Sequence, residues 1–345
     1  MGAPPGNAGR APEAAPAAAY RRGTRAPPRP AGRARGAAPE PPTGAVPARV
    51  LAHFGPTGVG KTDGAIALAD LMRARGERPV AVSADALQVY VGLEILTGVP
   101  DRAQRARLEH RLISFLPVDA RFSVAEYAHL AHAEIDGLLA DGATPIVVGG
   151  TGLYLRAALA ELTLRPPPPQ GARERWEAEL RARGPEQLHA QLAGEAPWAA
   201  ESIDPRDRHR IVRALELLEQ GALEAPTEPS RLWTRDTRHP TRLVGLVRDR
   251  DELYARIERR VDAMIAAGVE DEVRRAHAAG ASPTARVALG FDELLTGDVE
   301  TMKRRTRNYA RRQLTWMRKL PDVELVDIGG RSPPQVAAAI DSAPA

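Results

Sequence analysis

The chain has 345 residues, a formal net charge of +4 at pH 7 and a charged fraction of 27%, which is ordinary for a globular protein. It contains no Cys, which excludes disulfides, Cys-ligated zinc and thiol nucleophiles, and no apolar run is long enough to span a bilayer. We therefore expect a cytoplasmic protein that does not bind membranes, with one sizeable core plus an insertion or a second small domain.

Residues 1–47 are mostly Ala, Pro, Gly and Arg, with Glu13 and Glu40 as the only acids. Such a segment cannot bury enough apolar surface to offset the entropy of folding, so we predict a disordered extension. Both an inert tail and a loose nucleic-acid-binding arm fit this composition.

The next segment combines a buried strand, predicted over residues 49–54, with a helix predicted over 61–75. Between them lies Gly55-Pro56-Thr57-Gly58-Val59-Gly60-Lys61-Thr62, which has the spacing of a P-loop. The backbone N–H groups of such a loop and the helix N-terminus bind phosphate oxygens, Lys61 adds a positive charge, and the Thr62 hydroxyl can ligate Mg²⁺. The pattern predicts a diphosphate site.

A second buried strand is predicted over residues 79–83, and Asp85 follows it. Because the carboxyl ends of parallel strands share one crevice, we expect Asp85 to face the P-loop. There it would hold Mg²⁺ through water or accept a proton from a nucleophile. The local sequence fits equally well with Asp85 as a helix N-cap.

The middle of the chain continues the alternation, with a helix predicted over 124–140 and a strand over 145–148 that leads into Gly149-Gly150-Thr151-Gly152. Alternating strands and helices indicate parallel βαβ units. No predicted strand ends in the Asp of a Walker B motif, which argues against a motor or switch NTPase.

The pattern changes at Pro166, after which residues 173–220 are helical and highly charged, and a strand returns at 243–247. We predict an α/β fold, a P-loop NTPase-like parallel sheet core with a helical insertion domain and C-terminal helices. The predicted divisions are a core (48–164), the insertion (165–240), the core completion with basic C-terminal helices (241–330) and a tail (331–345). The charge run over 303–319 fits either a solvated helix face or a phosphate-binding face.

Several of these segments together resemble the tRNA dimethylallyltransferase (tRNA isopentenyltransferase) family over about residues 48–320. The P-loop, the Ser83-x-Asp85-x-x-Gln88-Val89-Tyr90 segment and Val148-Gly149-Gly150-Thr151-Gly152-Leu153-Tyr154 occur in the family's order and spacing. Further similar segments are Asp204-Pro205-x-Asp207, Arg210 to Glu216, Arg250-Asp251-Glu252-Leu253 and Thr306 to Trp316.

The resemblance implies transfer of a dimethylallyl group from dimethylallyl diphosphate to N6 of adenine 37, beside the tRNA anticodon, with Mg²⁺ bound by Thr62. It implies that Asp85 is the general base, that Thr57 lies near the reacting centre and that Arg250 is a catalytic diphosphate ligand. The implied diphosphate ligands are Gly55, Pro56, Thr57, Gly58, Val59, Gly60, Lys61, Thr62 and Arg250. The implied contacts with the tRNA anticodon stem-loop are Asp85, Ala86, Leu87, Gln88, Thr151 and Arg173. We expect a monomer.

Three departures from the family pattern affect substrate recognition rather than the reaction class. Ala86 stands where the family usually has Ser, Val99 replaces a Lys, and Arg206 replaces an Asn. Two other functions stay open. An adenylate isopentenyltransferase would use the same donor with a free nucleotide, and a small-molecule P-loop kinase would use residues 165–240 as a lid. The basic C-terminal helices favour tRNA.

Overall fold

The computed structural model describes residues 49–169, 171–225 and 230–342; the predicted disordered extension over 1–47 lies outside them. The core is a parallel sheet in the order β3-β2-β4-β1-β5-β6, as expected for βαβ units. Its strands are β1 (Val50–Phe54), β2 (Pro79–Ala84), β3 (His110–Arg111), β4 (Thr144–Gly149), β5 (Thr241–Val247) and β6 (Glu324–Asp327). The predicted α/β fold class is confirmed.

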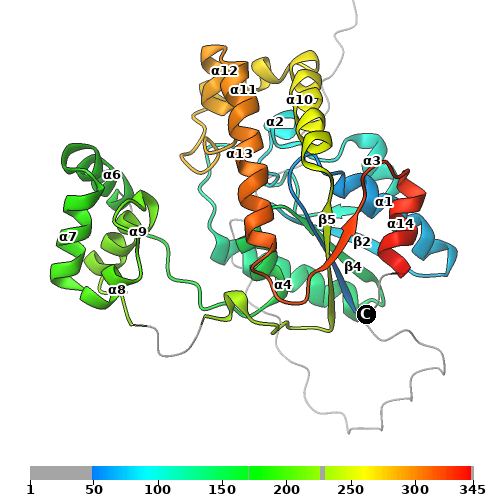
Figure 1. The fold of residues 1–345 in the computed structure, drawn as a ribbon, viewed down its shortest axis with the longest axis horizontal. Helices are drawn as coiled ribbons and strands as arrows, with labels where there is room; N and C mark the ends of the chain where they lie inside the picture. Colours follow the sequence, from blue (N-terminus) through cyan, green and yellow to red (C-terminus); the bar gives the residue numbers. More distant parts are fainter. Residues whose placement is uncertain (1–48, 170, 226–229, 343–345) are drawn as a thin grey trace, which may run out of the picture. The chain divides into compact units, whose positions relative to one another are not determined.

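Helices cover both faces of this sheet, and alternate residues of β1 point to opposite sides, as a strand requires. Val50, Ala52 and Phe54 pack with α4 (Val124–Ala140) and α5 (Gly152–Leu159). Leu51 packs on the other face with α1 (Lys61–Ala74) and α14 (Pro333–Ser342), which lie side by side in Figure 1. The crevice at the carboxyl ends of the strands is therefore left for a ligand.

A second group of helices builds a wall beyond those carboxyl ends. Buried residues of its members share an apolar cluster that includes Tyr90, Leu96 and Phe291. The helices that contribute to this cluster are α2 (Glu94–Thr97), α10 (Arg250–Ala266), α11 (Val269–Ala278), α12 (Phe291–Thr296) and α13 (Val299–Met317). The short helix α3 (Arg102–Arg107) follows α2 and has no buried residues. Asp249 and Asp298 cap α10 and α13 by accepting backbone hydrogen bonds, so local sequence sets where these helices begin.

The predicted helical stretch over 173–220 forms four helices with an apolar cluster of their own, including Leu188, Leu192, Ile211 and Leu215. They are α6 (Ala172–Arg183), α7 (Pro185–Glu195), α8 (Pro197–Glu201) and α9 (Arg208–Glu219), and a short 3₁₀ helix, η2 (Arg231–Trp233), follows. The division into insertion and core remains a prediction.

Two elements near the C-terminus were not predicted. β6 is an edge strand of four residues, and Leu325 within it is exposed, so it lacks the apolar run of a buried strand. The segment predicted as a tail contains α14, which buries Val336, Ala337 and Ile340 against α1. Its Ala- and Pro-rich sequence resembles a low-complexity tail, and only contact with α1 gives its short apolar stripe a partner.

Candidate active site

The P-loop lies where predicted, between β1 and α1. Gly60 adopts φ 109° at the N-cap of α1, a left-handed conformation that favours Gly. The Nζ atom of Lys61 donates hydrogen bonds to the carbonyl oxygens of Gly55 (2.9 Å) and Pro56 (3.0 Å). The ammonium group is therefore held inside the loop by the loop's own backbone.

Two arginines donate hydrogen bonds to carbonyl oxygens of the loop. Arg248 donates to the Val59 carbonyl (2.7 Å), and Arg256, on α10, donates to the Gly58 carbonyl (2.9 Å). These two contacts tie carbonyl oxygens of the loop to α10 and to the residue that follows β5.

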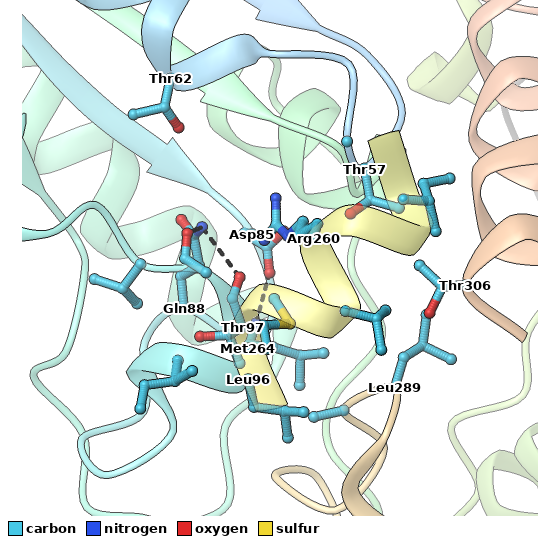
Figure 2. Close-up of a pocket in the computed structure, with 18 of the residues that line it drawn as sticks. Thr57, Thr62, Asp85, Gln88, Leu96, Thr97, Arg260, Met264, Leu289 and Thr306 are labelled. Carbon is cyan, nitrogen blue, oxygen red and sulfur yellow. Dashed lines mark hydrogen bonds between the residues drawn. The ribbon is translucent and has the colours of Figure 1, made fainter. Parts of the chain in front are cut away.

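Asp85 follows the end of β2, next to β4, and its side chain lines a cleft of about 1080 Å³ (Figure 2). Its Oδ1 atom accepts a hydrogen bond from the Leu87 backbone N–H (2.9 Å), which forms an Asx turn. No helix begins there, because the next one starts at Glu94, so Asp85 is not a helix N-cap. Its Oδ2 atom has no hydrogen-bond partner among the described residues.

The polar part of the cleft contains two cations close to Asp85. Burial lowers the pKa of Lys61 to about 8, and the nearby Asp85 carboxylate partly opposes that shift. Burial also lowers the pKa of Arg260, again with Asp85 acting in the opposite direction. Arg260 comes from α10, lies against Gly98 and makes no ion pair among the described residues. These groups form a site for a multivalent anion.

One wall of the same cleft is apolar. Figure 2 shows Leu96, Met264 and Leu289 on the side of Asp85 and Arg260 that lies away from Thr62. Val99, which replaces a Lys of the family pattern, also lines the cleft. The cavity thus combines an anion site with space for a hydrocarbon group.

The structure does not bring Arg250 into this cleft. Arg250 is the first residue of α10, its side chain is 75% exposed, and its nearest contacts are Asp251 and the ring of Tyr254. Arg256 and Arg260 are one helical turn apart on the face that lines the cleft. Arg250 therefore lies outside the cleft, and its role as a diphosphate ligand stays a prediction.

The residues implied to contact tRNA fall into two groups. Ala86, Leu87, Gln88 and Thr151 line the cleft. The Gln88 side chain is also used by the fold, because it accepts from the Ser83 hydroxyl (2.8 Å) and donates to the Gly98 carbonyl (3.0 Å).

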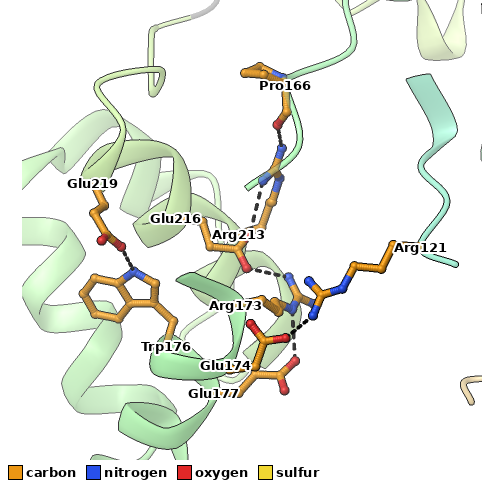
Figure 3. A network of polar contacts seen from close by, with 9 residues as sticks. All are labelled: Arg121, Pro166, Arg173, Glu174, Trp176, Glu177, Arg213, Glu216 and Glu219. Carbon is orange, nitrogen blue, oxygen red and sulfur yellow. Dashed lines mark hydrogen bonds and ion pairs between the residues drawn. The ribbon is translucent and has the colours of Figure 1, made fainter. Parts of the chain in front are cut away.

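Arg173 does not line the cleft. Figure 3 shows it on α6, where it donates to Glu177 (2.9 Å) and to Glu216 (3.1 Å), whose side chain is fully buried. Arg213 also donates to Glu216, so this carboxylate is neutralised from two sides. The Arg173 side chain therefore stabilises the packing of α6 on α9 and is not directed toward the cleft.

The described residues contain neither a ready-made metal cluster nor a helix that could span a membrane. No group of three or more His, Asp or Glu side chains in residues 49–169, 171–225 and 230–342 is placed to hold a metal ion. No helix in the same ranges is both long and apolar enough to cross a membrane.

Comparison with known proteins agrees with this geometry. The sequence matches the IPP transferase family over residues 88–320. A tRNA dimethylallyltransferase of Thermobifida fusca is 41% identical over 286 residues, covering 79% of this chain and 88% of that protein. The corresponding protein of Streptomyces coelicolor is 40% identical, covering 81% and 91%. The chain belongs to the tRNA dimethylallyltransferase family.

Solved structures of this family share the fold. The tRNA isopentenylpyrophosphate transferase of Bacillus halodurans is 29% identical with a TM-score of 0.59, covering 85% of this chain and 97% of that one. The Staphylococcus epidermidis enzyme is 29% identical with a TM-score of 0.60, covering 86% and 98%. A eukaryotic dimethylallyltransferase acting on tRNA has a TM-score of 0.65 at 23% identity, which shows a common fold alone.

Three residues that line the cleft of this tRNA dimethylallyltransferase family member were not predicted from the sequence: Arg260, Tyr309 and Gln313. Burial raises the pKa of Tyr309 to about 12, helped by the negative charge of Asp85, so its hydroxyl stays protonated. Tyr309 and Gln313 belong to the Thr306–Trp316 segment that resembles the family. The spacing of Tyr309 and Gln313, four residues apart on α13, was the available signal that they share a face.

Proposed function

We propose that the protein transfers a dimethylallyl group from dimethylallyl diphosphate to N6 of adenine 37 in tRNA, as a cytoplasmic monomer. The observation that carries the proposal is a cleft in which the P-loop, the cations of Lys61 and Arg260 and the carboxylate of Asp85 converge beside an apolar wall. Each part has a task in this reaction, as follows.

The anion site suits the leaving group of the donor. When N6 attacks the allylic C1, the C1–O bond breaks and diphosphate leaves with the electron pair. Lys61 and Arg260 then neutralise charge that grows on the bridging oxygen, a preorganised electrostatic effect that acts mainly on the transition state. The apolar wall at Leu96, Met264 and Leu289 accepts the dimethylallyl group.

Asp85 suits the role of general base. The lone pair of adenine N6 is delocalised into the ring, so attack becomes favourable only as a proton is lost. The Asx turn at Leu87 uses Oδ1, which leaves Oδ2 to take that proton as the N6–C1 bond forms. Such a base contributes roughly 10²–10⁴-fold in rate.

The cleft also fits Mg²⁺ bound together with the donor. The Thr62 hydroxyl lines the cleft at the start of α1, and Asp85 lies across from the loop. Mg²⁺ binds through few protein ligands, substrate phosphates and water, so a site without a three-residue cage is suitable. When bound, the ion would supply further charge neutralisation to the diphosphate through Thr62.

The acceptor adenine has to leave the base stack of the anticodon loop before it can react. An adenine reaches an enclosed cleft only after base flipping, and we propose that Ala86, Leu87, Gln88 and Thr151 surround it. Outside the cleft, exposed arginines on α13 provide a surface for RNA phosphates.

The decisive experiment is incubation of the protein with dimethylallyl diphosphate, Mg²⁺ and unmodified tRNA that carries adenines at positions 36 and 37, followed by nucleoside mass spectrometry. We expect one dimethylallyl group on adenosine. AMP replaces tRNA in a second reaction, and product there alone would indicate an adenylate isopentenyltransferase. Thermal protection by ATP and not by dimethylallyl diphosphate would indicate a kinase.

A further inference from the structure

Gln313 is a buried amide side chain that links two loops of the cleft. It lies on α13 and is 5% exposed. Its Oε1 atom accepts a hydrogen bond from the backbone N–H of Thr57 (2.8 Å), and its Nε2 atom donates to the carbonyl of Gly150 (2.8 Å). Because one end must accept and the other must donate, the two contacts fix the orientation of the amide.

These two loops follow adjacent strands and separate at the cleft. The last backbone contact between them joins the Gly55 N–H to the Gly149 carbonyl at 3.4 Å. Beyond that point the P-loop turns toward α1 and the Gly149-Gly150 segment turns toward α5. The Gln313 side chain joins the two loops again, at Thr57 in one and at Gly150 in the other. Gln313 lies 256 residues from Thr57 along the chain.

The space around the Gly150 contact is filled. A Cβ atom added to Gly150 would lie 2.4 Å from Nε2 of Gln313 and 3.2 Å from Nζ of Lys61. The β4–α5 loop, the amide of Gln313 and the ammonium group of Lys61 are thus packed against one another. A displaced Gln313 would leave buried donors and acceptors of both loops unpaired.

The Thr57 contact determines what the P-loop presents to the ligand. Since its N–H is bonded to Gln313, Thr57 contributes its hydroxyl, and not its N–H, to the cleft. Figure 2 shows that hydroxyl directed toward the side that holds Asp85 and Arg260. The orientation of the Thr57 peptide, and with it the hydroxyl, depends on Gln313.

We propose that Gln313 is a positioning residue, which orients Thr57 and preforms the P-loop for the diphosphate of the donor. The two hydrogen bonds of Gln313 carry the structural part of this inference. Its test by kcat rests on the proposed function. It predicts that Gln313 acts through Thr57, so the effects of changing the two residues will not add.

The test compares four variants at saturating tRNA and dimethylallyl diphosphate. Gln313→Met keeps the side-chain length and removes both hydrogen bonds, and Gln313→Glu keeps an acceptor for the Thr57 N–H. Thr57→Val removes the hydroxyl alone. Thr315→Val is the matched control, because Thr315 is an exposed residue of α13 whose hydroxyl bonds only to its own helix.

We expect Gln313→Met to lower kcat by roughly 10²-fold, the scale of a small misplacement in an active site, while KM for tRNA changes less than threefold. Gln313→Glu should retain more of kcat, and Thr315→Val should match the wild type. In a Thr57→Val background, Gln313→Met should cost much less than in the wild type. Full additivity, or a wild-type kcat in Gln313→Met, would overturn the inference. If Gln313→Met fails to fold, the same two outcomes are read from Gln313→Leu, which also removes both hydrogen bonds.

Binding of inorganic diphosphate, measured by calorimetry, separates this inference from the proposed function. A wild-type protein that makes no prenylated product contradicts the proposed function. In that case roughly tenfold weaker diphosphate binding by Gln313→Met still supports preformation of the P-loop by Gln313. Equal binding by Gln313→Met and the wild type overturns it.

Discussion

Substitution of two arginines on α10 should have different effects on binding of the donor. Arg260 lies in the cleft near Lys61 and Asp85, while Arg250 is exposed at the start of the helix. The free energy gained from a hydrogen bond to a charged group depends on such burial, because water competes at an exposed site.

Arg260→Gln should therefore weaken binding of dimethylallyl diphosphate by roughly 10–100-fold, from the loss of a charge-assisted contact. Arg250→Gln is the matched control and should change affinity less than twofold. Calorimetric titration of both variants measures the difference. A larger loss of affinity in Arg250→Gln than in Arg260→Gln would show that Arg250 is the diphosphate ligand, as the sequence resemblance implies.

Asp85 allows a variant that keeps the local fold and removes the base. In Asp85→Asn the side-chain oxygen still accepts from the Leu87 N–H, so the Asx turn remains. We expect kcat to fall roughly 10²–10⁴-fold, because an amide cannot take the N6 proton. Filter binding should show unchanged tRNA affinity; a loss of binding together with turnover would make Asp85 a structural or recognition residue.

At the scale of the element, α13 has two halves with different electrostatic environments. Toward its N-terminus, Lys303 pairs with Asp262 (2.7 Å) and Arg307 with Glu258 (2.7 Å). Toward its C-terminus, Arg311 and Arg318 are exposed, and neither forms an ion pair within the part of the chain that the structure describes. Arg311 and Arg318 therefore offer unneutralised charge to a phosphate backbone, whereas the charges of Lys303 and Arg307 are neutralised.

Replacing Arg311 and Arg318 together by Ala should weaken tRNA binding and reduce the slope of log K against log salt concentration by about 2, one for each lost phosphate contact. The matched control replaces Lys303 and Arg307 by Ala, and its slope should change much less. Filter binding across a salt series gives both slopes. Equal slopes for the two variants would show that α13 is a solvated face.

At the scale of the whole molecule, His53 links stability to pH. It lies fully buried in β1, at the centre of the sheet, and neither ring nitrogen has a hydrogen-bond partner among the described residues. Burial, with the nearby Arg242 as a smaller cause, lowers the pKa of His53 to about 4. Folding therefore keeps this imidazole neutral at pH values where it is protonated in the unfolded chain.

Between pH 6.5 and about 4 the unfolded state binds more protons at His53 than the folded state does, so stability falls as the pH falls through this window. The full effect is about 3 kcal/mol. His53→Leu should remove this part of the acid sensitivity, while His129→Leu, at an exposed position of α4, should keep it. Urea unfolding at pH 7 and pH 4.5 measures the change, and equal losses in His53→Leu and the wild type would contradict it.

Much of the site could be predicted because its chemistry is local in the sequence. The P-loop is one continuous segment, and the position of Asp85 follows from a strand of parallel order that ends beside it. The helix at Val124–Ala140 was predicted at its observed bounds, since a Ser123–Glu126 capping box and a regular apolar stripe specify it.

What the sequence by itself determined was therefore the fold class, the place of the P-loop between β1 and α1, and the position of Asp85 at the end of β2. These depend on neighbouring residues and on periodicity. Only the tertiary structure decided which arginine of α10 faces the cleft, that Arg173 is bound by Glu216, and that Gln313 joins two loops. The reason is physical: these contacts connect segments distant along the chain, and their energy comes from burial and from partners that exist only once the core has packed.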